Sequence, residues 1–190
     1  LEECNEFWDG LGSRVSAQEK LLTLAVTGGI PRYLEEMNPH LSAEQNIKNL
    51  CFIPEGILFR EFNQILSDLF GDKKTLYREI CESLALGAAD AQTIYKRIGV
   101  KGAGDDYKHL KNLTLSGFIA RDYRWHFNSG EVAKIPWYRL SDNYCRFYLK
   151  YIRPNQHKIE NNAYTDIALT SLPGWSSIVG LQIENLVLWI

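Results

Sequence analysis

The sequence predicts a mainly helical protein that contains one small β-hairpin. Apolar residues recur at helical spacing along most of the chain, as at Leu58, Phe62 and Ile65. Residues 118–125 are rich in strand-forming side chains, the turn-forming residues 128–130 follow them, and a return strand is expected through Ile135, Trp137, Tyr138 and Leu140. A chain of 190 residues, 45% of them hydrophobic, suffices for one large domain or two small ones.

The first part of the chain is expected to be a small helical bundle, over about residues 16–70. Ser16 and Ser42 each stand three residues before a Glu or Gln, which is the spacing of a capping box at a helix N-terminus. A longer amphipathic helix follows, with Leu66 and Leu69 on its apolar side.

Between the first two helices of this bundle the sequence predicts a tight corner. Gly28 and Gly29 suit a helix end, because glycine adopts positive φ without a Cβ clash. Pro31 suits the first position of the next helix. Such a corner brings little side-chain bulk and could let a flat ligand approach the backbone. From the residues alone, an ordinary helix–helix corner is the commoner interpretation.

A phosphate-binding loop is missing from this sequence. Such a loop needs the pattern G-x-x-x-x-G-K-[ST], and no Gly-Lys dipeptide occurs in the chain. The nearest candidate, residues 71–75, lacks the first glycine and has Asp72 in the loop. This chain alone is therefore not expected to hydrolyse a nucleotide.

The middle of the chain predicts three helices followed by the hairpin. The helices are expected over about 74–86, from an N-cap at Asp90, and from Asp105 or Asp106 to Gly117. The third should carry Tyr107 on its apolar side together with Leu110 and Leu113. This order of elements is that of a winged helix-turn-helix domain.

The last part begins with a helix that Ser141 is expected to cap and Pro154 to end. The aromatic residues Tyr144, Phe147, Tyr148 and Tyr151 fall on one side of it, as for packing. Residues 154–173 are polar and mixed, as in a linker, and a further helix starts near residue 175.

Charge and cysteine content limit the function classes. The net charge is −2, but residues 1–70 carry −6 and residues 90–140 carry +4, a pattern that suits different partners for different segments. The four cysteines form no C-x-x-C pair and the four histidines lack metal-ligand spacing. No apolar run approaches the roughly 20 residues that span a bilayer. We expect a cytoplasmic protein with no membrane partner. The missing initiator Met and the apolar C-terminus suggest a fragment.

Three motifs, in order, give the chain a family resemblance. They are Gly28 to Leu34 (Gly-Gly-x-Pro-x-Tyr-Leu), Arg139 to Asp142 (Arg-Leu-Ser-Asp) and Gly180 to Glu184. With these motifs the chain resembles the archaeal-type predicted ATPases of the AAA+ superfamily, close to the STAND signalling ATPases. Ile183 departs from the family pattern, which usually has Phe there.

The resemblance implies three regions. They are a helical lid-type bundle (1–71), a winged helix-turn-helix domain (72–153), and a linker with the truncated start of a PD-(D/E)-x-K nuclease-like domain (154–190). The P-loop domain would precede Leu1, so ATP and Mg²⁺ would bind the full-length protein and no cofactor is expected in this fragment. Glu184 would be a metal ligand only in a complete nuclease-like domain.

The resemblance also assigns binding residues and leaves alternatives open. The lid corner would contact nucleotide through Gly28, Gly29, Pro31 and Arg32 and would relay nucleotide state to the winged helix, although a solvated Arg32 is at least as plausible. The winged helix would bind duplex DNA through Lys96, Arg97, Lys108, His109, Lys111, Asn112, Arg121, Arg124 and Lys134. Asp105 and Asp106 oppose phosphate binding, so a winged helix used for interdomain switching or protein interaction, and a stand-alone transcription regulator, remain alternatives. The aromatic residues Trp125, Trp137, Tyr138 and Trp175 could stack on unpaired bases, but packing is the favoured interpretation.

Overall fold

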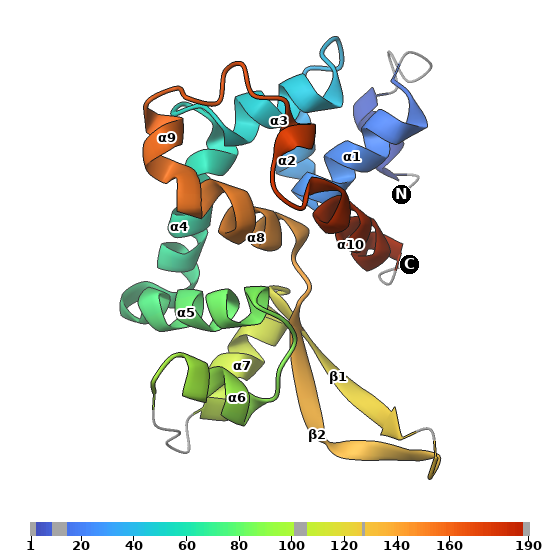
Figure 1. Cartoon of the computed structure of the whole chain (residues 1–190), viewed down its shortest axis with the longest axis vertical. Coiled ribbons are helices and arrows are strands. Elements are labelled where there is room, and N and C mark those ends of the chain that lie inside the picture. The colour runs from blue at the N-terminus through green and yellow to red at the C-terminus, as the bar shows by residue number, and fades with distance from the viewer. Residues whose placement is uncertain (1–2, 9–14, 101–105, 127, 188–190) are drawn as a thin grey trace. The chain divides into compact units, whose positions relative to one another are not determined.

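The computed structural model describes residues 3–8, 15–100, 106–126 and 128–187 (Figure 1). The predicted mainly helical fold with a small hairpin is confirmed for these residues. The chain divides into two compact units, residues 1–62 with 150–190 and residues 63–149. The division falls within the helix Ile57–Phe70 and the helical turn Tyr148–Ile152, so each unit contains part of both.

The discontinuous first unit holds short helices from both ends of the chain. Their bounds are η1 Glu3–Trp8, α1 Ala17–Thr27, α2 Pro31–Glu35, α3 Ala43–Cys51, the start of α4 Ile57–Phe70, η4 Arg153–Asn155, α9 Gln156–Glu160, η5 Leu169–Ser171 and α10 Trp175–Val187. Both predicted capping boxes form, at Ser16 with Glu19 and at Ser42 with Gln45. Each supplies partners to backbone groups that the helix itself leaves unpaired.

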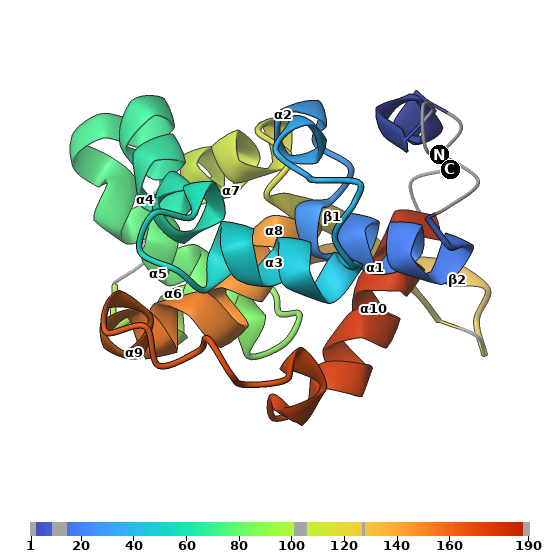
Figure 2. The ribbon, with the colours of Figure 1, turned by 90° about the horizontal axis from the view of Figure 1, so that it is seen from above.

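The core of the first unit joins the two ends of the chain. Helix α10 packs along α1 (Figures 1 and 2), and Trp8, Leu24 and Leu34 form a buried cluster there. Phe52, from the N-terminal segment of this unit, stacks on Tyr164 from its C-terminal segment, with ring centroids 5.0 Å apart.

The stretch 154–173, for which the sequence predicts a linker, contains α9 and η5 and packs into this unit. Ile159, Tyr164 and Leu169 are buried. The backbone N–H of Leu169 donates to Oε1 of Glu44 at 2.8 Å. This stretch is therefore ordered by the same core that holds α3.

The second unit contains the end of α4, then η2 Gly71–Lys73, α5 Lys74–Ala85, α6 Ala91–Arg97, α7 Asp106–Leu115, β1 Ile119–His126, β2 Glu131–Leu140, α8 Asn143–Phe147 and the start of the π-helical turn η3 Tyr148–Ile152. Strands β1 and β2 pair antiparallel, with Arg121 opposite Tyr138 and Tyr123 opposite Pro136. An irregularity follows: one residue of β1 and three of β2 separate this pair from the next, Trp125 with Val132.

A third short backbone segment extends this hairpin. Ala89, between α5 and α6, forms an isolated antiparallel bridge with Tyr138, whose backbone N–H and C=O both bond to it, at 2.8 and 3.0 Å. The three helices then pack on one side of the pairing, with Ile80, Ile94 and Leu110 fully buried.

The structure corrects the predicted helix boundaries after the hairpin. Asp142, and not Ser141, caps α8, because its carboxylate accepts from the backbone N–H of Cys145. The Ser141 hydroxyl instead donates to the carbonyl of Gly117 at 2.8 Å. Pro154 does not end the helical path, since it lies at the first turn of η4, where proline costs no hydrogen bond, and α9 follows.

Candidate nucleic-acid interface

Helix α7 has an inner and an outer face. Leu110 and Leu113 are fully buried on the inner face. Tyr107, Lys111 and Leu115 recur every four residues on the outer face, and the side chain of Tyr107 is 61% exposed. The prediction that Tyr107 lies on the apolar side is therefore wrong. The helix is rotated so that the tyrosine shares a face with a lysine.

A pocket of about 180 Å³ lies where this outer face meets the hairpin. Its walls are formed by Tyr107, Lys111, Thr114, Leu115, Arg121 and Tyr138. Pockets that enclose a whole small molecule run from roughly 300 to 1,000 Å³. This pocket is therefore large enough for one ring or side chain of a larger ligand and too small for a complete cofactor.

Burial and charge at the pocket act together on the buried hydroxyl of Tyr138. Burial raises the pKa of Tyr138, and the nearby Arg121 guanidinium partly offsets that rise. Tyr107 and Tyr123 act on the same hydroxyl in the raising direction. Arg121, Tyr107 and Tyr123 thus all lie near enough to Tyr138 to act on its charge.

Arginines of β1 lie over aromatic rings on both sides of the hairpin. The guanidinium of Arg121 lies 5.1 Å from the ring centroid of Tyr123, and that of Arg124 lies 3.1 Å from the centroid of Trp137. Alternation along a strand places residues 121 and 123 on one side and residue 124 on the other. Contact with an aromatic face holds each guanidinium in place while leaving its N–H groups available to an anion.

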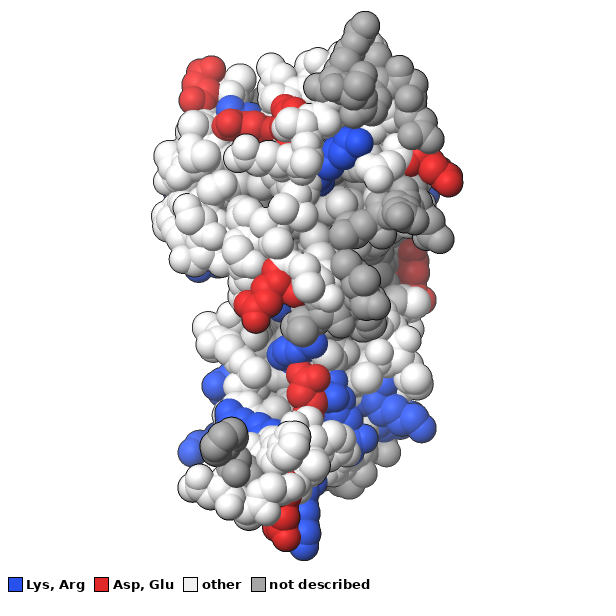
Figure 3. All heavy atoms as spheres, turned by 90° about the vertical axis from the view of Figure 1, so that its right-hand side faces the viewer, with Lys and Arg blue, Asp and Glu red and all other residues white. Residues whose placement is uncertain are grey.

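Among the described residues of α7 and the hairpin, basic side chains outnumber the acidic Asp122 and Glu131. Lys and Arg side chains gather over the part of the molecule that carries the hairpin (Figure 3). The predicted phosphate contacts on α7 and the hairpin are all exposed: Lys108, Lys111, Arg121, Arg124 and Lys134. The carboxylate of Asp122 pairs with Arg139 at 2.7 Å, and this ion pair neutralises it. Asp105 and the side chain of Asp106 lie outside what the structure describes.

Two residues predicted to reach base edges lie on the inner face of α7 instead. His109 is buried, with Nδ1 3.1 Å from the hydroxyl of Tyr77. The side-chain amide of Asn112 donates to the same hydroxyl at 2.8 Å. These contacts hold α7 against α5, and in this structure they turn both side chains away from the outer face.

Helix α6 contributes less to the surface than the sequence predicts. Lys96 is exposed. Arg97 donates to the carbonyls of Ser83 and Gly87, at 2.9 and 3.2 Å, and so caps the end of α5. A cation near a helix C-terminus is favourable for that helix, so Arg97 has a structural role where it lies.

The hairpin ends at a buried polar junction. The Arg146 guanidinium donates to the carbonyl of Leu140, and burial lowers its pKa. Burial also raises the pKa of Asp142 to about 6, although the Cys145 N–H and the charge of Arg146 oppose that rise. Together with the Ser141 hydrogen bond to Gly117, these groups fix where β2 passes into α8.

The corner of the first unit has the predicted backbone. Gly28 caps α1 in the left-handed region, with φ of 69°, and its N–H donates to the carbonyl of Leu24 at 2.8 Å. Pro31 begins α2. Gly29 is also left-handed, and a Cβ there would lie 3.6 Å from Sγ of Cys4, at ordinary contact distance. Turn η1 therefore lies against one side of the corner.

Arg32 lies on the solvent side of the same corner. Its side chain is 67% exposed, and Nε is 4.0 Å from Oε1 of Glu61. A pair at this distance and exposure contributes little to stability.

The structure describes no metal site. Glu184 is exposed on α10, and the described residues contain no group of three or more His, Cys, Asp or Glu side chains that could hold a metal ion. Likewise, within the described part of the chain no helix is long and apolar enough to cross a membrane.

The sequence did not predict that Tyr107, Thr114 and Leu115 line a pocket, nor that Tyr123 lies beside it. A signal was present, because Tyr107, Lys111 and Leu115 are spaced i, i+4, i+8. Trp125 was expected to pack and is 73% exposed, whereas Tyr138 and Trp175 are buried as expected and Trp137 is half-buried beneath Arg124.

Comparison with known proteins finds a similarity to an archaeal protein. A protein of Methanocaldococcus jannaschii, "Uncharacterized protein MJECL04", is 30% identical over 138 residues, which are 72% of this chain and 30% of that protein. The chain thus spans about a third of the length of this curated relative. No family model and no solved structure matches the chain.

Proposed function

We propose that residues 63–149 form a winged helix that binds duplex DNA, in the regulatory part of a cytoplasmic AAA+/STAND-like ATPase. The observation that carries this proposal is the exposed basic face shared by α7 and the hairpin. It combines Lys108 and Lys111 on the helix with Arg121, Arg124 and Lys134 on the strands. Such a face attracts phosphate, since binding releases the counterions condensed on nucleic acid.

The order of elements supports the winged-helix assignment. Helix α5, the short segment at Ala89, helices α6 and α7, and then β1 and β2 follow one another, and Ala89 pairs with β2 as a third strand would. In winged helices the last of three helices enters the major groove and the hairpin lies beside the backbone. The outer face of α7 would then enter the groove, with the hairpin as the wing.

The wider role rests on the resemblance and on the corner. Gly28, Gly29, Pro31 and Arg32 would contact nucleotide in a full-length protein that binds ATP and Mg²⁺, and α1 and α2 would change their junction with nucleotide state. The winged helix would receive that change, and Glu184 would belong to a nuclease-like domain. A stand-alone winged-helix transcription regulator would use the same basic face without nucleotide.

A second function, docking of a protein partner, is favoured by a separate observation. Leu115 on α7 and Val132 on β2 are 76% and 62% exposed, and pairing with Trp125 places Val132 on the pocket side of the hairpin. Exposed apolar side chains gathered on one surface are a feature of protein-binding sites. In that case the winged helix would be an interaction module, and salt would affect its binding weakly.

Salt-dependent DNA binding tests the proposal directly. The whole chain is titrated against a labelled blunt DNA duplex of about 20 base pairs, two helical turns, and fluorescence anisotropy is followed between about 50 and 200 mM salt. Replacing Lys108 and Lys111 by Ala should lower the slope of log Kd against log salt concentration by about 2.

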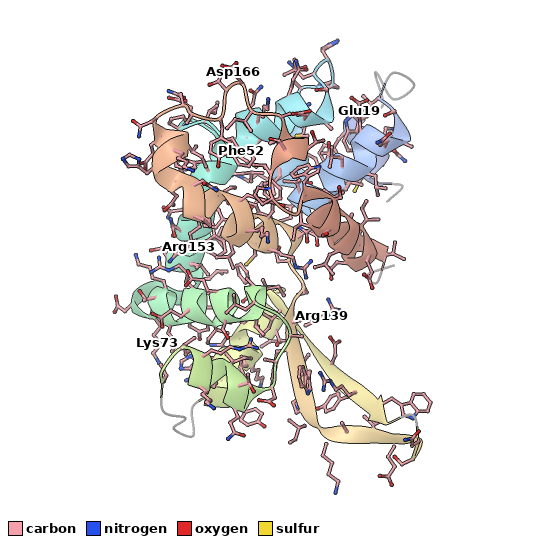
Figure 4. The ribbon with its side chains drawn as sticks, in the orientation of Figure 1. Glu19, Phe52, Lys73, Arg139, Arg153 and Asp166 are labelled. Atoms are coloured by element: carbon pink, nitrogen blue, oxygen red, sulfur yellow. The ribbon has the colours of Figure 1, made fainter. Side chains whose placement is uncertain are left out.

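A matched pair of lysines serves as the control. Lys73→Ala with Lys158→Ala removes the same charge from exposed positions, and Lys73 lies in η2, just before the start of α5 and away from the hairpin (Figure 4). This control should retain the wild-type slope. No binding at the lowest salt concentration would overturn DNA binding and favour the interaction module.

A further inference from the structure

Beyond the basic residues, the proposed DNA-binding face carries a strip of exposed aromatic rings. Tyr107 on α7 and Tyr123 and Trp125 on β1 are 61%, 48% and 73% exposed. We define these three residues as the aromatic strip. Exposed large aromatic side chains are costly to leave in water, so several on one surface indicate a ligand that covers them.

The three rings lie on the same side of the hairpin as the pocket. Arg121 lines the pocket and its guanidinium contacts the ring of Tyr123, so both side chains face that way. Trp125 is two residues further along β1, and the extra residues of the irregularity are on β2. Strand alternation therefore places Trp125 on the side of Arg121 and Tyr123.

Flat rings beside cations match the chemistry of unpaired nucleotides. A phosphate backbone pairs with Lys111 and Arg121, while bases stack on aromatic side chains in a sequence-tolerant manner. A regular duplex buries its bases in the helical stack and offers none of them to a ring. The contacts with the aromatic strip therefore need a strand whose bases are free.

The pocket adds a place for a single base. Its volume of about 180 Å³ suits one flat ring, and its lining includes the aromatic residues Tyr107 and Tyr138. Lys111 and Arg121 are among the residues that line it, and both can donate hydrogen bonds to a polar base edge.

We propose that this face prefers DNA with an unpaired overhang, the duplex lying on the basic residues and the overhang bases on the aromatic strip and in the pocket. This inference rests on the proposed DNA binding. An acidic protein segment could also satisfy the cations, but carboxylates do not use the exposed rings, which is why unpaired DNA is favoured.

The test compares two labelled duplexes of equal length, one blunt and one with a short thymidine overhang, bound by the whole chain and followed by anisotropy. The overhang should tighten binding at least about tenfold, since each stacked base contributes roughly a 5- to 150-fold factor. Trp125→Ala should remove most of this gain and leave blunt-duplex affinity within about twofold, whereas Tyr107→Ala should lower the ratio of overhang affinity to blunt-duplex affinity.

Three control variants make the result specific. Tyr107→Phe and Trp125→Phe retain a ring and should retain most of the preference. Leu86→Ala removes an exposed apolar side chain, 80% exposed at the end of α5, from outside the strip and should change neither affinity. Circular dichroism melting curves establish that each variant is folded.

The outcomes separate the two proposals. Equal affinity for the blunt and overhang duplexes would overturn the preference and leave duplex binding standing. Absence of binding to either DNA would overturn both. Displacement of the overhang duplex by polyglutamate more readily than by an unlabelled thymidine oligonucleotide, at equal charge concentration, would overturn the preference in favour of an acidic protein segment.

Discussion

The Gly28–Pro31 corner and the surface formed by α7 and the hairpin are both candidate binding sites, yet one is formed by backbone conformation and the other by side chains. The corner depends on backbone: two glycines in the left-handed region and a proline at a helix start. The α7–hairpin surface depends on side chains, with exposed cations and rings supported by a buried polar junction.

This difference indicates which kinds of substitution should affect each site. A backbone corner responds to changes of conformational preference and offers few groups that recognise a ligand, apart from Arg32. A side-chain surface responds to loss of charge or of a ring, while its underlying packing is tested by changes beneath it. Substitutions should therefore separate stability from binding differently in the two regions.

The largest expected effect concerns pH and the junction beneath the hairpin. Because burial raises the pKa of Asp142 to about 6 in the folded protein, from 3.8, the folded state holds this proton more tightly than the unfolded state does. The contribution of Asp142 to the free energy of unfolding is thus greatest below about pH 4. It falls by up to about 3 kcal/mol as the pH rises to about 6.

Asp142→Asn keeps a capping side chain and removes the titration. The difference in the free energy of unfolding between variant and wild type, from urea titrations, should be near its minimum at pH 4 and should favour the variant increasingly up to about pH 6 to 7. A difference that stays constant across this range would contradict the prediction. The corner contains no comparable buried carboxylate among its described residues.

At the corner itself, Gly28→Ala should destabilise the protein by about 1.5 kcal/mol, since a Cβ is unfavourable in the left-handed region that Gly28 occupies. Gly180→Ala is the matched control, because Gly180 is exposed in helix α10 and a Cβ there meets nothing within 4 Å. The control should gain about 0.5 to 1 kcal/mol.

Thermal melting measures both glycine variants. Neither should alter the affinity for DNA of the folded chain. A large change in DNA affinity with Gly28→Ala would break the distinction between the two regions and indicate that the corner acts on the α7–hairpin surface.

The fold was predictable from the sequence where local chemistry determines structure. The capping boxes at Ser16 and Ser42 and the corner at Gly28 follow from side-chain and backbone preferences within a few residues, and each forms as predicted. The predicted N-cap of α8 was wrong because Ser141 and Asp142 are both good capping residues. Only the packing of β2 decides between them.

The charged residues of the candidate surface were predictable from the sequence, but which side chains of α7 face outward was not. Helical spacing shows that Tyr107 lies near Leu110 and also near Lys111, so periodicity alone does not decide which neighbour shares its side. The hydroxyl of Tyr77, 32 residues from His109, decides it by drawing His109 and Asn112 inward. Such long-range contacts carry no local sequence signal.

That contact between helices gives the next prediction. Tyr77→Phe retains the ring, which stacks on Phe70 with centroids 3.8 Å apart, and removes the hydroxyl shared by His109 and Asn112. Stability should fall by about 1 kcal/mol, as for loss of a mostly buried hydrogen bond. DNA affinity measured below the melting transition should stay within about twofold.

An affinity loss well beyond twofold would show that the inner-face residues take part in recognition. Lys111→Ala is the contrasting variant, because it changes the outer face of the same helix. It should weaken DNA binding and its salt dependence while leaving the melting temperature nearly unchanged.

The smallest effect on stability is expected at Arg32. Its guanidinium is mostly exposed and 4.0 Å from Glu61, so Arg32→Ala should change the free energy of unfolding by less than about 0.5 kcal/mol. Glu61→Ala should match it, since the pair is broken either way. If both variants melt like the wild type, Arg32 is not required for packing. A loss of nucleotide binding in the full-length protein on Arg32→Ala, but not on Glu61→Ala, would then show that Arg32 contacts the nucleotide. A marked fall in melting temperature on Arg32→Ala would instead make the arginine a structural part of the corner.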